Sequence, residues 1–416
     1  MEQPSIKLSH PTKEISGVVQ LTGSKSESNR ALIIQAISAG KVNIQNLSSA
    51  DDTLLLTNAL KTAHGSFDNS VKTIDIGPAG TAMRFLTSYL NLLGGEFLLT
   101  GTSRMQQRPI GILVNALNSI GTDIQYAQHE GYPPLRIHGP LIQSQKSVKI
   151  KGDVSSQYIS SLLLIASALE KGLTLEIEGE LTSLPYVTMT LNMLNEVGIK
   201  HLWIENSIQI QAQRAQESTL YIEPDWSAAS YWYAIVALSK TGSIRLPGLK
   251  KNSLQGDIAI ADIMTHFGVK TTFEADGIYL EKTDIVSDKT LFDFKSCPDL
   301  AQTVVVVASV LKRDVSFTGL ETLRIKETDR IAALQKEIAK YGAGLEEDGV
   351  NYHLHTQNVA DPGTIAIKTY EDHRMAMAFA PLALVFKSII IEEPQVVEKS
   401  YPAFWEDLQN QGFFTS

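Results

Sequence analysis

The segment Arg324–Arg330, RIKETDR, holds the side chains of this sequence that are best suited to acid–base and anion chemistry. Lys326 and Arg330 are cations, Glu327 lies between them, and an amphipathic run at helical spacing follows. A helix start already carries partial positive charge, and cations placed there add to it. The segment therefore predicts an anion site at a helix N-terminus, and a solvated, mixed-charge helix start is the alternative.

Six polar residues at two further expected helix starts can bind a phosphate or sugar hydroxyls through amines, hydroxyls and an amide. They are Lys25, Ser26, Arg30, Ser155, Ser156 and Gln157. The P-loop pattern GxxxxGK[ST] is absent from the sequence, so this is not a nucleotide-type loop. In both places the alternative is a serine N-cap, with exposed basic residues beside it in the first.

Three arginines and two acids complete the candidate set. Arg84, Arg108 and Arg374 lie near expected helix starts in apolar stretches, where a guanidinium pairs well with a carboxylate or phosphate. Structural ion pairs are the alternative for each of them. Asp299 and Glu327 are candidate proton acceptors. Lys326, which precedes Glu327, is a candidate proton donor because neighbouring cations can lower its pKa. For Asp299, an N-cap is the alternative.

These residues must be positioned by six segments in which a polar, glycine-containing or acidic stretch leads into an apolar helical run. The segments start at Gly23, Gly77, Gly152, Glu223, Cys297 and Tyr370. Strand-like runs occur at 148–150, 173–177, 208–210 and 389–391, and second helices are expected from Pro109, Val187 and Ile258, each ending at a glycine. The starts are about 55 to 75 residues apart, the length of a strand–helix–strand–helix–strand unit. We therefore predict six copies of one such unit, with a domain boundary near 222–225.

Composition limits the class of protein. A chain of 416 residues is expected to form two domains of roughly 200 residues, and 43% hydrophobic with 19% charged residues is typical of a globular protein. No apolar run reaches the roughly 18 residues of a membrane span, and the N-terminus lacks a targeting pattern, so we expect a cytoplasmic protein. A net charge of -9 argues against nucleic acid as the main partner.

Neither a metal nor a nucleotide cofactor is expected. Cys297 is the single cysteine, which excludes disulfides and thiolate clusters within the chain. His353 and His355 alternate on an expected strand and are more often surface residues than ligands. The sequence contains no HExxH, GxSxG or GxGxxG pattern.

Taken together, the motifs resemble the 5-enolpyruvylshikimate-3-phosphate synthase family. The resemblance runs nearly end to end, through LTGSKSESNRALI, AGTAMR, RMQQRPIG, VSSQY, NSLQGD, RIKETDR, EDHRMAM and KSYP in the family's order. It implies an α/β protein in the form of a two-domain inside-out α/β barrel, with three βαβαββ units per domain and an active site in the interdomain cleft. One domain would be discontinuous, residues 1–22 and 224–416, and the other would span residues 23–223.

The resemblance also implies a reaction. The enolpyruvyl group of phosphoenolpyruvate would pass to the 5-hydroxyl of shikimate 3-phosphate, with release of phosphate, through a tetrahedral ketal that is not attached to the enzyme. It implies a monomer without a cofactor. Both substrates are anions, so bringing them together requires several preorganised cations.

The site residues are carried over at the positions that match the family's motifs. Shikimate 3-phosphate would contact Lys25, Ser26, Arg30, Ser155, Ser156, Gln157, Ser183, Tyr186, Asp299 and Lys326. Phosphoenolpyruvate would contact Lys25, Gly80, Arg108, Gln157, Arg330, Arg374 and Lys399. Asp299 and Glu327, with Lys25 and Lys326, would carry the proton transfers, and which group takes which proton is left open.

Four positions depart from the family's pattern, and two other functions stay open. The departures are Pro78, Phe85, Leu184 and Thr322, the last replacing an asparagine that would contact a substrate. One alternative is the sister transferase that acts on UDP-N-acetylglucosamine, although the loop cysteine typical of it is missing near Arg108. The other is a non-catalytic protein that binds phosphorylated metabolites, which would gain nothing from carboxylates beside its ligand.

Overall fold

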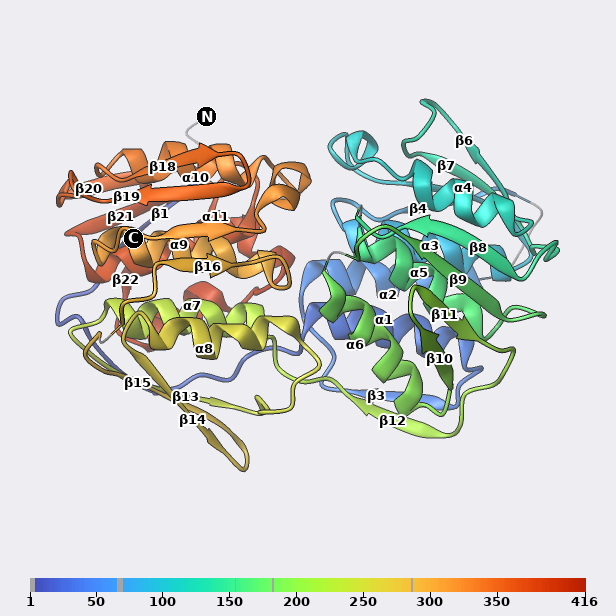
Figure 1. Cartoon of the computed structure of the whole chain (residues 1–416), viewed down its shortest axis with the longest axis horizontal. Coiled ribbons are helices and arrows are strands. Elements are labelled where there is room, and N and C mark those ends of the chain that lie inside the picture. The colour runs from blue at the N-terminus through green and yellow to red at the C-terminus, as the bar shows by residue number, and fades with distance from the viewer. Residues whose placement is uncertain (1–3, 66–69, 154, 182, 286) are drawn as a thin grey trace. The chain divides into compact units, whose positions relative to one another are not determined.

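The computed structural model describes residues 4–65, 70–153, 155–181, 183–285 and 287–416 (Figure 1). The chain divides into two compact units. Unit 1 consists of Met1–Thr22 and Glu223–Ser416, and unit 2 of Gly23–Ile222. Within the described residues, no helix has the length and apolar character needed to cross a membrane.

Unit 2 contains two four-stranded mixed sheets and one pair of parallel strands among its described residues. Its strands are β3 (Val42–Gln45), β4 (Lys72–Asp75), β5 (Gly95–Thr100), β6 (Asp123–Tyr126), β7 (Leu135–Gly139), β8 (Ser147–Lys151), β9 (Leu173–Glu178), β10 (His201–Ile204), β11 (Ser207–Ile210) and β12 (Ser218–Tyr221). Its helices are α1 (Lys25–Ile37), α2 (Asp51–His64), α3 (Gly80–Tyr89), α4 (Gly111–Ser119), α5 (Ser156–Ala166) and α6 (Leu184–Glu196). The sheet orders are β4-β5-β7-β6 and β10-β11-β9-β8, and β12 pairs with β3.

Unit 1 contains three four-stranded sheets among its described residues, ordered β20-β21-β1-β22, β14-β15-β13-β2 and β16-β17-β19-β18. Its strands are β1 (Ser5–Ser9), β2 (Glu14–Val18), β13 (Thr241–Pro247), β14 (Val269–Glu274), β15 (Gly277–Lys282), β16 (Leu291–Asp293), β17 (Ser316–Thr318), β18 (Gly344–Asp348), β19 (Asn351–His355), β20 (Thr364–Ile367), β21 (Ser388–Glu392) and β22 (Phe414–Thr415). Its helices are α7 (Trp226–Leu238), α8 (Ile260–Thr265), α9 (Ala301–Val310), α10 (Arg330–Ala339), α11 (His373–Phe379) and α12 (Phe404–Asn410).

Four of the five four-stranded sheets among the described residues repeat one plan, whereas in β20-β21-β1-β22 the antiparallel neighbours β1 and β22 come from opposite ends of the chain. Two parallel strands, such as β16 and β17, are followed by an antiparallel hairpin, such as β18 and β19. Parallel neighbours need a crossover helix, and a hairpin needs only a short turn, so the strand–helix–strand–helix–strand–strand order follows. The expectation of six equal copies is wrong in one place, because β3 and β12 form only a two-stranded sheet.

All six polar-to-apolar segments lead into helices, namely α1, α3, α5, α7, α9 and α11. In unit 1, α7, α9 and α11 contact one another, and nearly all of their residues are buried. A helix that is apolar on every side is stable only in such an interior. Their N-terminal residues are therefore fixed by a rigid core.

The second helices start at other residues than expected. Helix α4 begins at Gly111 rather than Pro109, whose carbonyl instead accepts hydrogen bonds from Arg84 and Tyr158. Helix α6 begins at Leu184, before Val187, and α8 begins after a 3-10 turn at Gly256–Ala259. The glycines expected after them, Gly121, Gly198 and Gly268, all have positive φ.

Candidate active site

Arg330 is the centre of a partly buried group of charged side chains in unit 1, which we call the unit 1 cluster. Its members are Asp299, Lys326, Glu327, Arg330, Asp372, Arg374 and Lys399. Arg330 is only 2% exposed and donates to Asp299 Oδ1 at 3.0 Å, to Glu327 Oε2 at 3.0 Å and to Asp372 Oδ2 at 2.6 Å. Such an arginine cannot leave its carboxylates without a large desolvation cost, so it orders the cluster.

Asp299 joins Arg330 to Arg374. Arg374 Nη2 donates to Asp299 Oδ2 at 2.9 Å, and Lys326 Nζ lies 3.9 Å from Asp299 Oδ1. Burial acts to raise the pKa of the Asp299 carboxyl, but the positive charges of Arg374, Lys326 and Arg330 outweigh it and hold the pKa below its ordinary value. Asp299 is therefore ionised near neutral pH.

Glu327 and the two lysines form the other side of the cluster. Lys399 Nζ donates to Glu327 Oε1 at 2.9 Å, while Arg330 occupies Glu327 Oε2. Burial lowers the pKa of Lys326, and the nearby charge of Asp299 only partly restores it. A lysine whose pKa is lowered in this way is a better proton donor than one with an ordinary pKa.

Two local expectations change once the contacts are known. The side chain of Asp299 does not cap α9, whose N-cap is Leu300, so the N-cap alternative for Asp299 is wrong. Helix α10 does carry an acid at its start, since Asp329 accepts a hydrogen bond from Ala332 N. The positive charge at this helix start is therefore offset, and the cluster holds four cations and three carboxylates.

Three residues behind Arg374 were not singled out from the sequence. Arg374 Nη2 lies 3.3 Å from Ser227 Oγ, which donates a short hydrogen bond to Asp257 Oδ2, and Arg374 Nη1 donates to Tyr231 OH at 3.3 Å. Burial and the charge of Asp299 raise the pKa of Asp257 to about 7. Asp257 belongs to the NSLQGD motif, so the motif marked it, although no local pattern indicated its burial.

Asp372 was also missed as a site residue. It binds the guanidinium of Arg330 and caps α11 by accepting from Arg374 N at 2.9 Å. Because Arg330 lies 42 residues earlier in the chain, spacing alone could not reveal this pair.

In unit 2, the starts of α1, α3 and α5 hold the expected polar residues. Ser24, and not Ser26, caps α1 by accepting from Glu27 N at 3.4 Å. Lys25 is largely buried and lies 3.1 Å from Asp52 at the start of α2. The alternative of exposed basic residues beside a serine cap therefore does not describe this segment.

Arg30 is enclosed by protein groups and is 2% exposed. Its guanidinium donates to Ser26 O at 2.8 Å, Thr190 Oγ1 at 2.7 Å, Ser160 Oγ at 3.1 Å and Tyr186 O at 3.3 Å. These bonds use four of its five N–H groups, and burial lowers its pKa to about 10. Arg30 thus fixes the candidate residues Ser26 and Tyr186 in the folded unit.

Gly80 and Arg108 lie against each other. A Cβ atom added at Gly80, the first residue of α3, would lie 2.5 Å from Arg108 Nη1. The guanidinium therefore packs on a helix start that only glycine leaves open. In contrast, Arg84 is buried and donates to Gly80 O and Pro109 O, which is a structural role.

The start of α5 combines a cap with candidate ligands. Ser155 accepts from Gln157 N at 3.3 Å, so the N-cap alternative holds for this serine, while Gln157 Nε2 donates to Thr81 Oγ1 of α3 at 3.2 Å. Ser156 is the first residue of α5 and is nearly buried. Val154 of the VSSQY motif lies outside the described residues.

Ser183 precedes α6 in a left-handed conformation with φ 54°, and Tyr186 stacks near the Arg30 guanidinium, 5.8 Å from the ring centre. Of the departures from the family's pattern, Phe85 is buried with the Arg30 guanidinium 5.5 Å from its ring centre. The Thr322 hydroxyl is buried without a hydrogen-bond partner among the described residues, and Leu184 is exposed.

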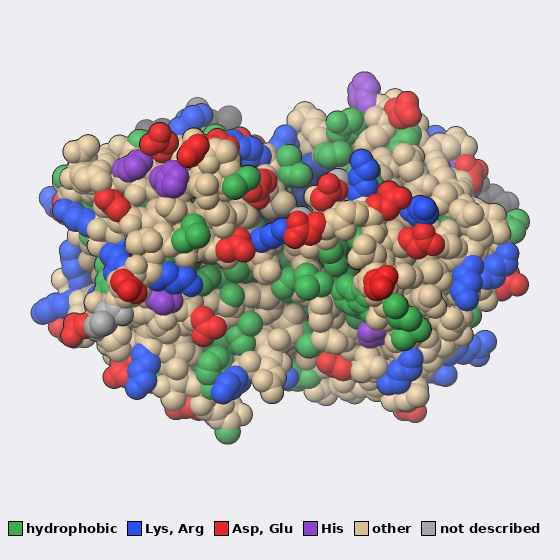
Figure 2. All heavy atoms as spheres, in the orientation of Figure 1, with side chains coloured by type: hydrophobic (Ala, Val, Ile, Leu, Met, Phe, Trp, Pro, Cys, Tyr) green, Lys and Arg blue, Asp and Glu red, His purple; other side chains and the backbone are tan. Residues whose placement is uncertain are grey.

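The two histidines of β19, His353 and His355, contact neighbouring side chains. His353 pairs with Ser316 and His355 with Glu346, and no group of three or more potential metal ligands occurs among the residues that the structure describes. On the face of the molecule seen in Figure 2, acidic and basic side chains are interspersed.

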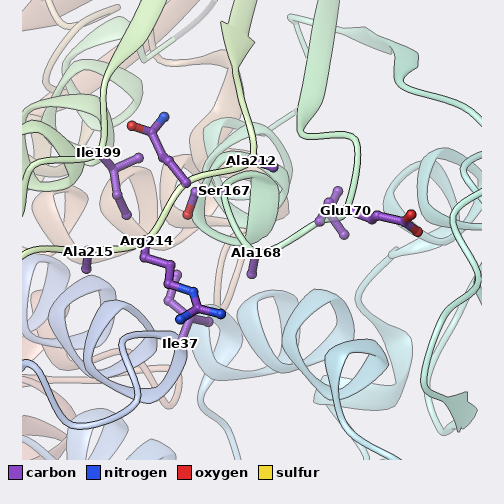
Figure 3. A pocket seen from close by; sticks show the side chains of 10 residues that line it. Ile37, Ser167, Ala168, Glu170, Ile199, Ala212, Arg214 and Ala215 are labelled. Atoms are coloured by element: carbon purple, nitrogen blue, oxygen red, sulfur yellow. The ribbon is translucent and has the colours of Figure 1, made fainter.

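A separate pocket of about 450 Å³ lies in unit 2 (Figure 3). It is lined by Ile37, Ser167, Ala168, Leu169, Glu170, Ile199, Ala212, Gln213, Arg214 and Ala215. None of these is a candidate site residue, so the pocket and the candidate site are distinct.

Comparison with known proteins points to one family. Residues 9–408 match the profile of EPSP synthase (3-phosphoshikimate 1-carboxyvinyltransferase). The 3-phosphoshikimate 1-carboxyvinyltransferase of Bacteroides fragilis strain YCH46 is 46% identical over 417 residues, covering 98% of this chain and 97% of that protein. The Vibrio atlanticus enzyme of the same name is 36% identical over 421 residues, covering 96% and 97%.

Solved structures show the same fold at low sequence identity. The EPSP synthase of Acinetobacter baumannii superposes with a TM-score of 0.78 at 20% identity, covering 99% of this chain and 100% of that one. The enolpyruvyl transferase NikO of Streptomyces tendae gives a TM-score of 0.72 at 14% identity, covering 100% of this chain and 99% of that one. The profile match over nearly the whole sequence, with relatives above 30% identity across both units, shows that the chain belongs to the EPSP synthase family.

Proposed function

We propose that this protein transfers the enolpyruvyl group of phosphoenolpyruvate to the 5-hydroxyl of shikimate 3-phosphate and releases phosphate. The observation that supports it most directly is the unit 1 cluster, where Asp299 and Glu327 are each held between two cations. Cations fixed in place can offset the charge of two anionic substrates, and carboxylates beside them can move protons. The enzyme would serve the shikimate pathway of aromatic amino acid biosynthesis.

The substrates would divide between the two units. Lys25, Ser26, Arg30, Ser155, Ser156, Gln157, Ser183 and Tyr186 of unit 2 would hold shikimate 3-phosphate, together with Asp299 and Lys326. Phosphoenolpyruvate would be held by Lys25, Gly80, Arg108, Gln157, Arg330, Arg374 and Lys399. The finer fold proposal is a pair of inside-out α/β barrels with the substrates in the cleft between them, in a cytoplasmic monomer that needs no cofactor.

The chemistry proceeds in two steps. In the addition step, the 5-oxygen bonds to C2 of phosphoenolpyruvate, the hydroxyl gives up its proton and the methylene carbon gains one. In the elimination step, the C2–O bond to phosphate breaks and the methyl group returns a proton. We assign the acceptor role toward the hydroxyl to Asp299, which is ionised, and the exchange at the methyl carbon to Glu327 with Lys326, whose lowered pKa favours proton donation.

The cluster also affects how phosphoenolpyruvate binds. Arg330, Arg374 and Lys399 already contact carboxylates, so an incoming phosphate adds to these pairs and need not replace water around bare cations. Preorganised cations of this kind lose little freedom when the substrate binds.

A phosphate-release assay tests the proposal. The purified protein should release phosphate only when shikimate 3-phosphate and phosphoenolpyruvate are both present, and Asp299→Asn or Glu327→Gln should lower kcat by about 100-fold or more. Release of phosphate with UDP-N-acetylglucosamine as the acceptor would indicate the sister transferase. Binding of each substrate in calorimetric titrations without turnover would indicate a non-catalytic binding protein.

A further inference from the structure

A strained turn precedes the two site residues at the start of α11. Asp372 N donates to Thr369 O at 3.0 Å, which closes a four-residue turn around Tyr370 and Glu371. Both central residues are left-handed, with φ of 54° and 57°. Two positive φ values define a type I′ turn, which strongly favours Asn, Asp and Gly at these positions. Tyrosine and glutamate adopt them only where the surrounding structure enforces them.

Glu337, which lies on α10, holds this turn in its left-handed conformation. Its side chain is 1% exposed, and its Oε1 accepts from Tyr370 OH at 2.7 Å. Its Oε2 accepts from Lys368 N at 3.1 Å and from Lys340 Nζ at 2.6 Å. The buried carboxylate of Glu337 therefore hydrogen-bonds to Lys368, just before the turn, and to Tyr370, the first of the two left-handed residues.

The turn delivers Asp372 to the unit 1 cluster. Asp372 caps α11 through Arg374 N and receives the guanidinium of Arg330, which lies on α10 seven residues before Glu337. Residues seven apart lie on the same side of a helix, two turns from each other. Helix α10 thus holds the turn at two points, one inside the cluster and one outside it.

We infer that Glu337 is a positioning residue for phosphoenolpyruvate binding, which acts by holding the Tyr370–Glu371 turn so that Asp372 and Arg374 are correctly placed. This inference rests on the proposed function. Glu337 itself contacts none of the proposed substrate ligands through any hydrogen bond described above. Replacing Glu337 is therefore expected to change the KM for phosphoenolpyruvate more than the KM for shikimate 3-phosphate.

Glu337→Gln tests the inference with little change of shape. The amide is neutral and has one acceptor oxygen, so when that oxygen accepts from Lys368 N, the Tyr370 hydroxyl loses its charged acceptor and is left to accept a weaker hydrogen bond from the amide NH2 group. We expect the KM for phosphoenolpyruvate to rise about tenfold and the KM for shikimate 3-phosphate to change less than threefold. Tyr370→Phe, which removes a single hydroxyl, should shift the same constant in the same direction and gives the same test if Glu337→Gln does not fold.

Two further variants separate positioning from plain stability. Lys340→Met removes an ion pair of Glu337 but leaves its contacts with the turn, so it should lower the unfolding temperature without the selective rise in KM. Glu371→Gly relieves the strain at an exposed position with positive φ, so adding it to Glu337→Gln should restore much of the affinity for phosphoenolpyruvate.

The outcomes are distinguishable. An active wild-type enzyme whose Glu337→Gln and Tyr370→Phe variants keep the wild-type KM for phosphoenolpyruvate overturns the inference alone. Equal rises in both KM values that follow the loss of thermal stability, as in Lys340→Met, also overturn it. A wild-type protein that releases no phosphate from the two substrates overturns the proposed function itself.

Discussion

The guanidinium of Arg330 binds the carboxylate of Asp372 through two nitrogen atoms, Nε to Oδ2 at 2.6 Å and Nη2 to Oδ1 at 3.4 Å. Both side chains are almost completely buried. A bidentate pair of this kind fixes the orientation of both partners. It joins the first residue of α10 to the cap of α11, and so it connects two of the three helix starts that build the unit 1 cluster.

We predict that Asp372→Asn destabilises unit 1, because it weakens a buried ion pair and leaves a charge less well compensated. Arg330 still contacts Asp299 and Glu327 in this variant, so we expect the free energy of unfolding to fall by about 3 kcal/mol. For a domain of this size, that loss lowers the unfolding midpoint by about 6 to 12 °C. Calorimetry would measure the midpoint. Asp348→Asn, at an exposed strand end, is the matched control and should shift the midpoint by about 1 °C or less.

Gly80→Ala should weaken phosphoenolpyruvate binding selectively. The new methyl group would lie 2.5 Å from Arg108 Nη1, so the guanidinium must move away from the helix start. Displacing an anion-binding group in this way should raise the KM for phosphoenolpyruvate about tenfold and leave that for shikimate 3-phosphate within threefold. Gly94→Ala, where the nearest atom is 3.9 Å away, is the control, and an effect of equal size there would contradict the explanation.

The pH dependence of activity should reveal Lys326. Burial places the pKa of this lysine below the ordinary value of 10.5, so it loses its proton at lower pH than an exposed lysine. As pH rises through that pKa, kcat/KM should fall. In Lys326→Arg, the residual activity should lack this alkaline decline, because arginine keeps its charge. Lys336→Arg, at an exposed site on α10, should keep the wild-type profile.

Asp257 should make the protein less stable at higher pH. Its pKa is about 7 in the folded protein against 3.8 for an ordinary aspartate, so between about pH 4 and 7 the folded state binds more protons than the unfolded state. The contribution of Asp257 to the free energy of unfolding is therefore greatest below about pH 4 and falls as the pH rises to about 7.

The replacement Asp257→Asn tests this directly. The variant should lose that part of the pH dependence and unfold at a higher temperature than wild type at pH 8, with a smaller difference at pH 5. Calorimetric scans at both pH values measure the difference. An identical pH dependence of the wild type and the variant would show that Asp257 stays ionised on folding.

The sequence alone determined the elements that depend on neighbours a few residues away. The six helix starts at α1, α3, α5, α7, α9 and α11 follow from a polar stretch before an apolar run, and the glycines after α4, α6 and α8 follow from the left-handed end of a helix. The grouping of Lys326, Glu327 and Arg330 is also local, since they lie within five residues. The motifs predicted the family, which the comparisons confirm.

Only the tertiary structure decided which charges meet. Asp299 and Arg374 lie 75 residues apart, and Arg330 and Asp372 lie 42 apart, so no periodicity within one element links them. Burial is likewise a property of the packed unit. Together with the charge of Asp299 it raises the pKa of Asp257, and the buried carboxylate of Glu337 holds the chain at the left-handed turn of Tyr370 and Glu371. A local pattern specifies where a helix begins, whereas the partner of a buried charge is chosen by the whole core that excludes water around it.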